Sequence, residues 1–96
     1  MKIYLTAILK ANPVYREEVI SVLQHMVKES RKEAECIQYD LHQSTADENQ
    51  FIFYEIWESR LGLDEHNQQP YILSFGRIAE EKLQEIPQIY LMEKIA

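Results

Sequence analysis

The sequence predicts an α+β fold in which a four-stranded antiparallel sheet carries its helices on one face. Apolar residues recur at every second position in four segments, which is the spacing of strands. In two longer segments they recur at three- and four-residue steps, which is the spacing of helices. No stretch rich in Gly, Ser or Pro divides the 96 residues, so one domain over residues 1–96 is expected.

The first strand is expected over Lys2 to Leu9, and both of its faces are largely apolar. Asn12 followed by Pro13 predicts a helix start, because the Asn side chain can accept from unpaired amides and Pro at the first helical position loses no needed donor. The helix is expected to run to about Glu33. Acidic residues lie near its start and basic residues near its end, as the helix dipole favours.

A hairpin with a long polar loop, TADENQ, is expected next. Its first strand is Cys36 to Ser44, and the residues on its apolar side are Ile37, Tyr39 and Leu41. Its second strand is Phe51 to Glu58. One side of that strand combines the charged Glu55 with Phe51, Phe53 and Trp57.

Ser59 can cap a short helix that ends at about Asn67. Pro70 then predicts the start of a longer helix, whose apolar face consists of Ile72, Phe75, Ala79 and Leu83. Pro87 ends the helical pattern, and the alternation over Gln88 to Lys94 predicts the last strand.

The order strand, helix, strand, strand, helix, strand is that of a ferredoxin-like βαββαβ domain, whose crossovers place both helices on one face of the sheet. The strands carry apolar residues on the other face as well. We therefore expect a second copy to cover that face in a two-fold symmetric homodimer, a dimeric α+β barrel. A monomer with a partly exposed sheet is the alternative.

The composition argues against several classes of partner. A formal charge of -6 opposes binding to phosphate backbones, so no nucleic-acid partner is expected. The first ten residues, MKIYLTAILK, alternate and are too short for a membrane span or a signal peptide. The sequence thus predicts a cytoplasmic protein with no membrane partner.

No metal or cofactor is expected. Cys36 is the only cysteine, which excludes an intrachain disulfide and a thiolate cluster for zinc. Asp64, Glu65 and His66 are consecutive on a predicted helix, so their side chains point in different directions and cannot close on one ion. With two glycines the chain has no phosphate-binding or dinucleotide loop, and flavin and nicotinamide motifs are absent.

Glu55, Trp57 and His66 are the candidates for chemistry. Burial would raise the pKa of Glu55 and make it a possible acid or base, although a salt bridge to Arg60, Arg77 or Lys82 is the preferred alternative. Trp57 offers an aromatic surface and one N–H donor, or else closes the core. His66 titrates near neutrality and could carry a proton, or else it is a solvated residue at a helix end.

Four further aromatic residues could line a mostly apolar cavity, as is common in small-molecule sites. They are Tyr39, Phe53, Tyr71 and Phe75. An aromatic core without a cavity fits the same periodicity.

Three segments carry a family resemblance: CIQYDLHQ (36–43), FYEIWES (53–59), and LDEH (63–66) followed by Pro70. They resemble the antibiotic biosynthesis monooxygenases, small dimeric ferredoxin-like proteins that include quinol monooxygenases and the enzyme that processes the phosphorylated autoinducer-2 signal. The resemblance implies oxidation of an electron-rich phenol or quinol by molecular oxygen without metal or prosthetic group. It also implies a pocket between sheet and helices, with Trp57, His66, Glu55 and Tyr39 at matching positions.

The chain differs from the resembled family at two positions. Tyr71 stands where many relatives place a second histidine, and Phe53 stands where some oxygen-using relatives carry a polar amide. A haem-degrading branch of the same fold needs a histidine on the last helix, and this chain has Gly76 at about that place and no histidine after His66. Haem degradation is therefore not expected.

The predicted function is a cofactor-independent monooxygenase acting on a small aromatic or quinol-like compound. His66 would exchange the proton, Glu55 would set its charge state, and Trp57 would form a stacking wall. Two alternatives remain open at this point. One is an isomerase or processing enzyme for a small phosphorylated compound, with Arg60 or Arg77 as phosphate anchor. The other is a ligand-binding domain without catalysis, which the differences at Tyr71 and Phe53 favour.

Overall fold

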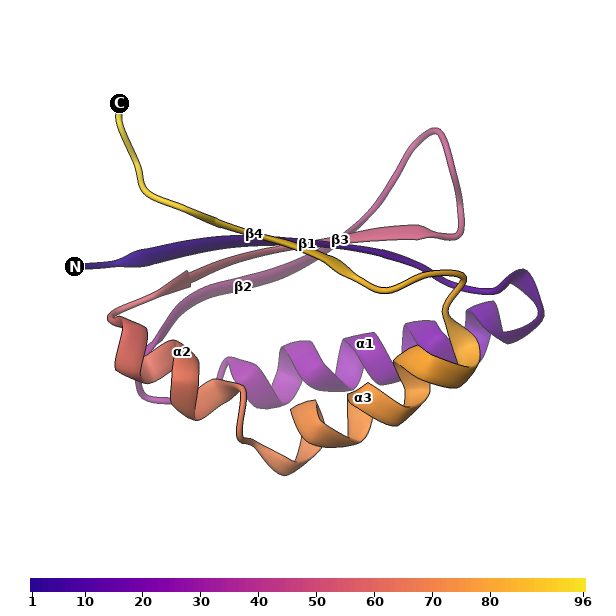
Figure 1. Ribbon diagram of the computed structural model, residues 1–96, viewed down its shortest axis with the longest axis horizontal. Coiled ribbons are helices and arrows are strands. Elements are labelled where there is room, and N and C mark those ends of the chain that lie inside the picture. The colour runs from indigo at the N-terminus through magenta and orange to yellow at the C-terminus, as the bar shows by residue number, and fades with distance from the viewer.

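The computed structural model describes residues 1–96 and places one antiparallel sheet over a layer of helices (Figure 1). The sheet has four strands in the order β2-β3-β1-β4, so β1 and β3 are the inner strands and β2 and β4 are the edges. The strands are β1 (Ile3–Lys10), β2 (Cys36–Gln43), β3 (Gln50–Trp57) and β4 (Gln88–Met92). The helices are α1 (Arg16–Ser30), α2 (Arg60–His66) and α3 (Pro70–Lys82), with a single 3-10 turn, η1 (Pro13–Tyr15), before α1.

The predicted fold class and element order are confirmed, and the element ends differ by a few residues. Asn12 Oδ1 accepts from the Val14 amide as expected, but the turn it caps is a 3-10 turn, and α1 begins only at Arg16. At its other end α1 stops at Ser30 rather than near Glu33. Beyond Ser30, backbone amides bond to carbonyls three residues back, such as Glu33 N to Ser30 O at 3.0 Å. These tighter turns end the α-helix.

The prediction that Ile37 shares one face of β2 with Tyr39 is wrong. Cys36 pairs with Trp57 while Gln38 pairs with Ile56, so two steps along β2 match one step along β3. This β-bulge leaves Ile37 as the extra residue and turns it out of the apolar face. Ile37 is consequently 41% exposed, whereas Tyr39, beyond the bulge, is 2% exposed.

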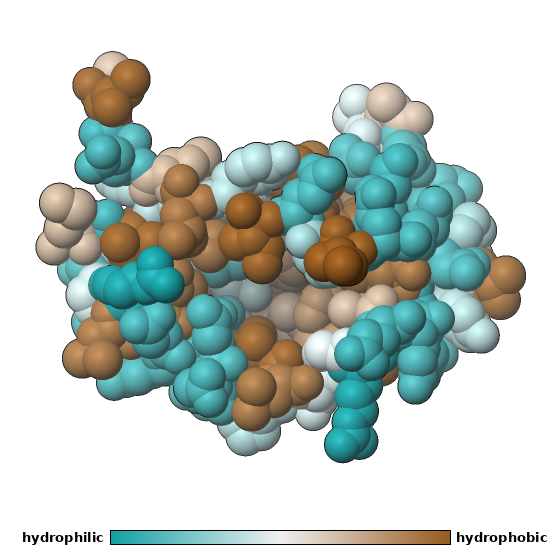
Figure 2. All heavy atoms as spheres, viewed as in Figure 1, coloured by the Kyte–Doolittle hydropathy of each residue, from teal (hydrophilic) through white to brown (hydrophobic).

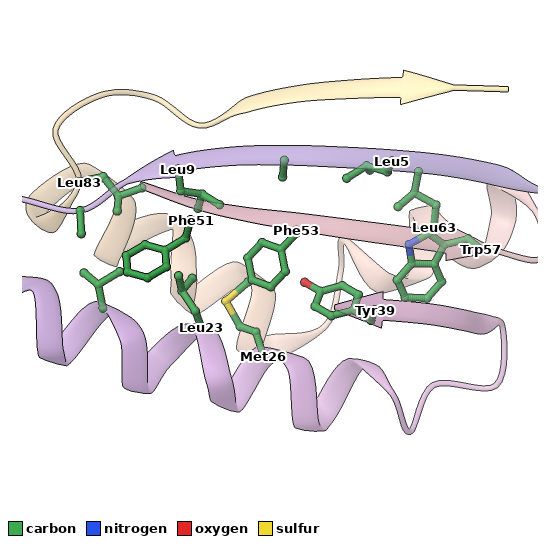
Figure 3. Close-up of a cluster of buried hydrophobic side chains, with 13 residues drawn as sticks. Leu5, Leu9, Leu23, Met26, Tyr39, Phe51, Phe53, Trp57, Leu63 and Leu83 are labelled. Atoms are coloured by element: carbon green, nitrogen blue, oxygen red, sulfur yellow. The ribbon is translucent and has the colours of Figure 1, made fainter. Parts of the chain in front are cut away.

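The core lies between α1 and the inner face of the sheet. Alternation along β1 and β3 turns every second side chain toward the helices, and three residues of α1 at helical spacing meet them (Figure 3). The strand residues are Leu5, Ala7, Leu9, Phe51, Phe53 and Trp57, and the helix residues are Val19, Leu23 and Met26. By contrast, α3 and β4 contain no fully buried residue.

The opposite face of the sheet has no helix over it (Figure 1). On β4, Tyr90 and Met92 pair with Thr6 and Tyr4 of this face and are 51% and 40% exposed. A shallow depression on this face is lined by Tyr4, Tyr54, Ile56 and Met92 together with Glu93 and Lys94. The longest helix has 15 residues, and none combines the length and apolar character that crossing a membrane requires.

The short helix α2 is held against the connection between α1 and β2. Gly62 is buried there, and a Cβ atom at this position would lie 2.4 Å from Cβ of Glu35. Ser59 Oγ caps the helix by accepting from the Gly62 amide at 3.1 Å, and the same hydroxyl donates to Glu35 Oε1 at 2.9 Å. The close approach of α2 to Glu35 therefore depends on glycine at position 62. It also positions His66, the last residue of α2, next to the connection between α1 and β2.

We expect Gly62→Ala to destabilise the protein by about 1–3 kcal/mol, because the added methyl group must displace either α2 or the backbone next to Glu35. Gly76→Ala on α3 is the matched control. Nothing lies within 4 Å of its added Cβ, so the better helix former should stabilise by roughly 0.5–1 kcal/mol. Urea unfolding midpoints measure both, and equal effects of the two changes would contradict the close contact.

Candidate functional site

A cavity of about 290 Å³ lies between the inner face of the sheet and α3. The space-filling view shows this hollow below the sheet, with apolar side chains around it (Figure 2). Ten of its fifteen lining residues are hydrophobic. The lining residues are Leu5, Ala7, Leu9, Met26, Tyr39, Phe53, Glu55, His66, Asn67, Ile72, Phe75, Gly76, Ala79, Pro87 and Ile89.

Five of the seven residues predicted for a site lie on the cavity wall: Tyr39, Phe53, Glu55, His66 and Phe75. The other two do not. Trp57 is fully buried behind the wall, and Tyr71 lines a separate groove between α1 and α3 together with His25. The functional roles given to these residues stay predictions.

Glu55 brings a carboxyl group into this apolar space. Its place on β3 turns it toward the helices, and it is 4% exposed. The preferred salt bridge is wrong: Arg60 pairs with Asp64, Lys82 pairs with Glu18, and neither reaches Glu55. Instead Trp57 Nε1, two residues along the same strand face, donates to Glu55 Oε1 at 2.9 Å.

The charge state of Glu55 follows from its burial and from its hydrogen bond with Trp57. Burial raises its pKa to about 7, and the bond from Trp57 opposes the shift only in part. A carboxyl group that titrates near neutrality can act as an acid or as a base at that pH. Oε2, the oxygen not bonded to Trp57, has no hydrogen-bond partner in the protein and is not an enclosed atom, so it is available to a ligand.

His66 is a buried residue rather than a solvated helix end. It is 4% exposed, and its ring packs on Trp57 with centroids 4.4 Å apart and on Tyr39 with centroids 5.4 Å apart. Burial lowers its pKa below the usual value, against an opposing contribution from Glu33. Nδ1 lies 2.7 Å from Glu33 Oε2, and Nε2 has no protein partner on the side where His66 lines the cavity.

Sequence reasoning missed Glu33. It lies in the connection between α1 and β2, and its side chain is 14% exposed. Glu33 Oε2 accepts from the Tyr71 hydroxyl as well as facing His66 Nδ1. These partners are 33 and 38 residues away in sequence. Within the run ESRKEAE, one acid among other charges carries no local signal of such a contact.

Tyr39 brings a buried hydroxyl to the cavity wall. Its ring packs against Phe53 at 5.1 Å, and Figure 3 shows the hydroxyl directed toward Met26 and Phe53, both of which line the cavity. Burial raises the pKa of Tyr39 far above its ordinary value, so the hydroxyl keeps its proton and can donate it.

Together these groups make an acid–base pair in an apolar cavity. Burial favours the neutral form of both Glu55 and His66, which leaves a carboxyl group with a raised pKa and an imidazole with a lowered one. Such a pair can take a proton from a bound hydroxyl group and return one to a product. Cys36 offers no competing nucleophile, because burial raises the pKa of its thiol to about 11.

Comparison with known proteins points to one family. The sequence profile described as Antibiotic biosynthesis monooxygenase matches residues 3–78. YcnE of Bacillus subtilis, which bears the name "Putative monooxygenase", is 35% identical over 81 residues, covering 84% of this chain and 85% of YcnE. The crystal structure of PA3566 from Pseudomonas aeruginosa matches with a TM-score of 0.92 at 34% identity, covering 99% of this chain and 95% of that one.

A third relative is longer than this chain. The Synechocystis protein sll1783 is 37% identical over 67 residues, which cover 70% of this chain and 46% of that protein. The match to it therefore concerns less than half of its length.

The burial of Glu55 predicts a pH-dependent stability. Its pKa is about 7 in the folded protein and about 4.5 in the unfolded chain, so between these values the folded state holds a proton that the unfolded state has lost. Stability therefore falls as the pH rises through this range. At about 1.4 kcal/mol per pH unit, the loss approaches roughly 3 kcal/mol above pH 7.

Glu55→Gln tests this, because the amide oxygen can still accept from Trp57 and His66 is present in both proteins. The variant should match the wild type at about pH 4.5 and exceed its free energy of unfolding at pH 8. Urea unfolding at one protein concentration measures the difference. A difference that does not change with pH would show that the burial of Glu55 has no such energetic effect.

Proposed function

Since the chain belongs to the antibiotic biosynthesis monooxygenase family, we propose that it oxidises a small phenol or quinol with molecular oxygen and without a bound cofactor. One observation carries the proposal. An imidazole nitrogen and a carboxyl oxygen, both without protein partners, belong to residues that line the same apolar cavity. A general base is what this reaction needs most, because the anion of a phenol passes an electron to oxygen far more readily than the phenol does.

The cavity suits a compact, uncharged aromatic molecule. Its volume of about 290 Å³ is at the lower end of ligand pockets, which span roughly 300–1,000 Å³. Aromatic and aliphatic side chains can hold the ring. His66, Glu55 and Tyr39 can bond hydroxyl or carbonyl groups at its edge.

The proposed reaction begins when His66 Nε2 takes a proton from a ring hydroxyl. The resulting anion transfers electrons to O₂, and a carbon–oxygen bond forms between the ring and one oxygen atom. Glu55 or His66 then takes the C–H proton from the carbon that gained oxygen while the other oxygen is protonated, which breaks the oxygen–oxygen bond, forms the new carbonyl and releases water. The ring gives up four electrons in total, loses two hydrogen atoms and gains one oxygen atom, so a phenol becomes a quinone.

The charge of the wall disfavours a phosphorylated substrate. Glu55, His66 and Tyr39 are the ionisable groups on the wall, and an ionised Glu55 would repel a phosphate. Neither Arg60 nor Arg77 lines the cavity, and Arg60 is paired with Asp64 at 3.0 Å on the surface. Processing of a phosphorylated signal compound is therefore the weaker hypothesis for this chain.

The uncovered sheet face supports the proposed homodimer. Its apolar side chains, including Tyr54 and Ile56 on β3 and Met92 on β4, have no helix over them. A second copy of the chain, related by a two-fold axis, would bury the same patch on both subunits and so remove it from water.

We expect His66→Ala to lower kcat by about 100-fold or more, because the proton acceptor is lost. His42→Ala is the control, since His42 is an exposed imidazole on β2 that bonds the Ile52 carbonyl. Oxygen uptake and quinone formation with a panel of hydroquinones and naphthols measure turnover. Undiminished turnover by the His66 variant would reject the assignment. Ligand-induced stabilisation of the wild type without oxygen uptake would favour the binding-domain alternative.

The dimer is expected to dissociate when a charge is placed in the uncovered face. Ile56→Glu should convert a species of twice 11.4 kDa into one of 11.4 kDa in analytical ultracentrifugation, with circular dichroism unchanged. Leu61→Glu on α2, where the side chain is 66% exposed, should leave the dimer intact. A wild type that sediments as a monomer would refute the proposed assembly.

A further inference from the structure

We propose that Glu33 is a positioning residue, which holds the proton of His66 on Nδ1 and thereby leaves Nε2 as the proton acceptor that the cavity presents. The catalytic consequence rests on the proposed function, whereas the position of the proton does not.

Three separate segments meet at one oxygen atom of Glu33. Glu33 comes from the connection between α1 and β2, His66 is the last residue of α2, and Tyr71 lies in the first turn of α3. His66 Nδ1 is 2.7 Å from Glu33 Oε2, and the Tyr71 hydroxyl donates to the same oxygen. The Glu33 side chain is 14% exposed and that of His66 is 4% exposed, so water competes little for these bonds.

The bond to Glu33 decides which ring nitrogen carries the proton. An ionised carboxylate only accepts hydrogen bonds, so the nitrogen that faces it must be an N–H group. A neutral imidazole has one N–H, and Nε2 is then the nitrogen with a free electron pair. The rings of Trp57 and Tyr39 pack against the imidazole, which opposes a ring flip that would exchange the two nitrogens.

Tyr71 supports this arrangement from outside the cavity. It lines the groove between α1 and α3, so it does not meet a ligand in the cavity directly. Burial, together with the bond to Glu33, raises the pKa of Tyr71 well above its ordinary value, so its hydroxyl stays a donor. Tyrosine at this position therefore donates a second hydrogen bond to Glu33 Oε2 and takes no part as a base.

The other titratable groups around His66 lie on different elements. Tyr39 on β2 contacts the ring and Glu55 on β3 lines the same cavity. His25 on α1 meets the outer edge of Tyr71, with centroids 6.4 Å apart. None of them faces Nδ1 at hydrogen-bond distance, which leaves Glu33 as the group that determines the tautomer.

A purely structural role for Glu33 would make a different prediction. A purely structural clip would change stability when removed, but it would leave the turnover of the remaining folded protein unchanged. The tautomer tests the position of the proton and can be measured without substrate, whereas kcat tests whether that position matters for catalysis.

The experiment compares the wild type with Glu33→Leu and Glu33→Gln by long-range nitrogen–proton NMR correlation of His66 at a pH above its pKa. The wild type should show the Nδ1–H tautomer. Glu33→Leu removes the acceptor, so we expect the Nε2–H tautomer, which free imidazole side chains prefer, and a kcat at least about tenfold lower with KM changed less than about threefold. Glu33→Gln keeps an acceptor oxygen and should retain the Nδ1–H tautomer and more of the activity than Glu33→Leu.

Glu29→Gln is the matched control, because Glu29 lies near Glu33 in the chain and pairs with Lys32 on the surface instead. It should leave both tautomer and kcat unchanged. An Nε2–H tautomer in the wild type would overturn the inference even if Glu33→Leu failed to fold. An unchanged tautomer and kcat in Glu33→Leu would also overturn it.

The two proposals fail in distinguishable ways. If Glu33→Leu changes the tautomer as expected while the wild type consumes no oxygen with any phenol or quinol, the inference on Glu33 stands and the proposed function fails. If His66→Ala abolishes oxygen uptake while Glu33→Leu retains both the Nδ1–H tautomer and full kcat, the proposed function stands and the inference on Glu33 fails.

Discussion

The contact between α2 and the connection that follows α1 is the constraint on which the site depends. A buried glycine, Gly62, lets the two backbones approach, and Ser59 and Glu35 join them by hydrogen bonds. At the far end of the same short helix, His66 meets Glu33 from the same connection at 2.7 Å. A helix of seven residues is too short to be stable alone, so its position must come from such contacts.

A second constraint is the burial of an acid on a central strand. Glu55 lies between two neighbouring strands, paired with Leu5 of β1 and Tyr39 of β2, so it cannot move toward water without breaking the sheet. Its hydrogen bond comes from a neutral indole rather than from a cation. The result is a carboxyl group that changes charge near neutrality. Its burial lowers the stability of the fold relative to a hydrophobic residue at the same position.

The sequence predicts the parts of this structure that depend on short-range spacing. Alternation placed Glu55 on the same inner face as Phe53 and Trp57, the Ser59 signal marked the start of α2, and the Asn12–Pro13 signal marked the 3-10 turn that precedes α1. What it could not predict depends on contacts between distant segments. The bulge at Ile37 is a property of the pairing of two strands, and the partners of Glu33 come from two helices that follow far along the chain. The burial of His66 was also not predictable from the local sequence. Its neighbours in the chain are polar, but the rings of Trp57 and Tyr39, from two strands, cover it.

The absence of any fully buried residue in α3 has an evolutionary consequence. Ile72, Phe75, Gly76 and Ala79 line the cavity from this helix, and three of them (Ile72, Phe75 and Ala79) pack against the core from outside its fully buried cluster. Mutations at these four positions can reshape the volume next to a bound molecule while the residues that stabilise the domain stay unchanged. The cavity thus has two kinds of wall: strand and α1 residues that are also core residues, and α3 residues that are only partly buried, where a change of side chain costs less stability.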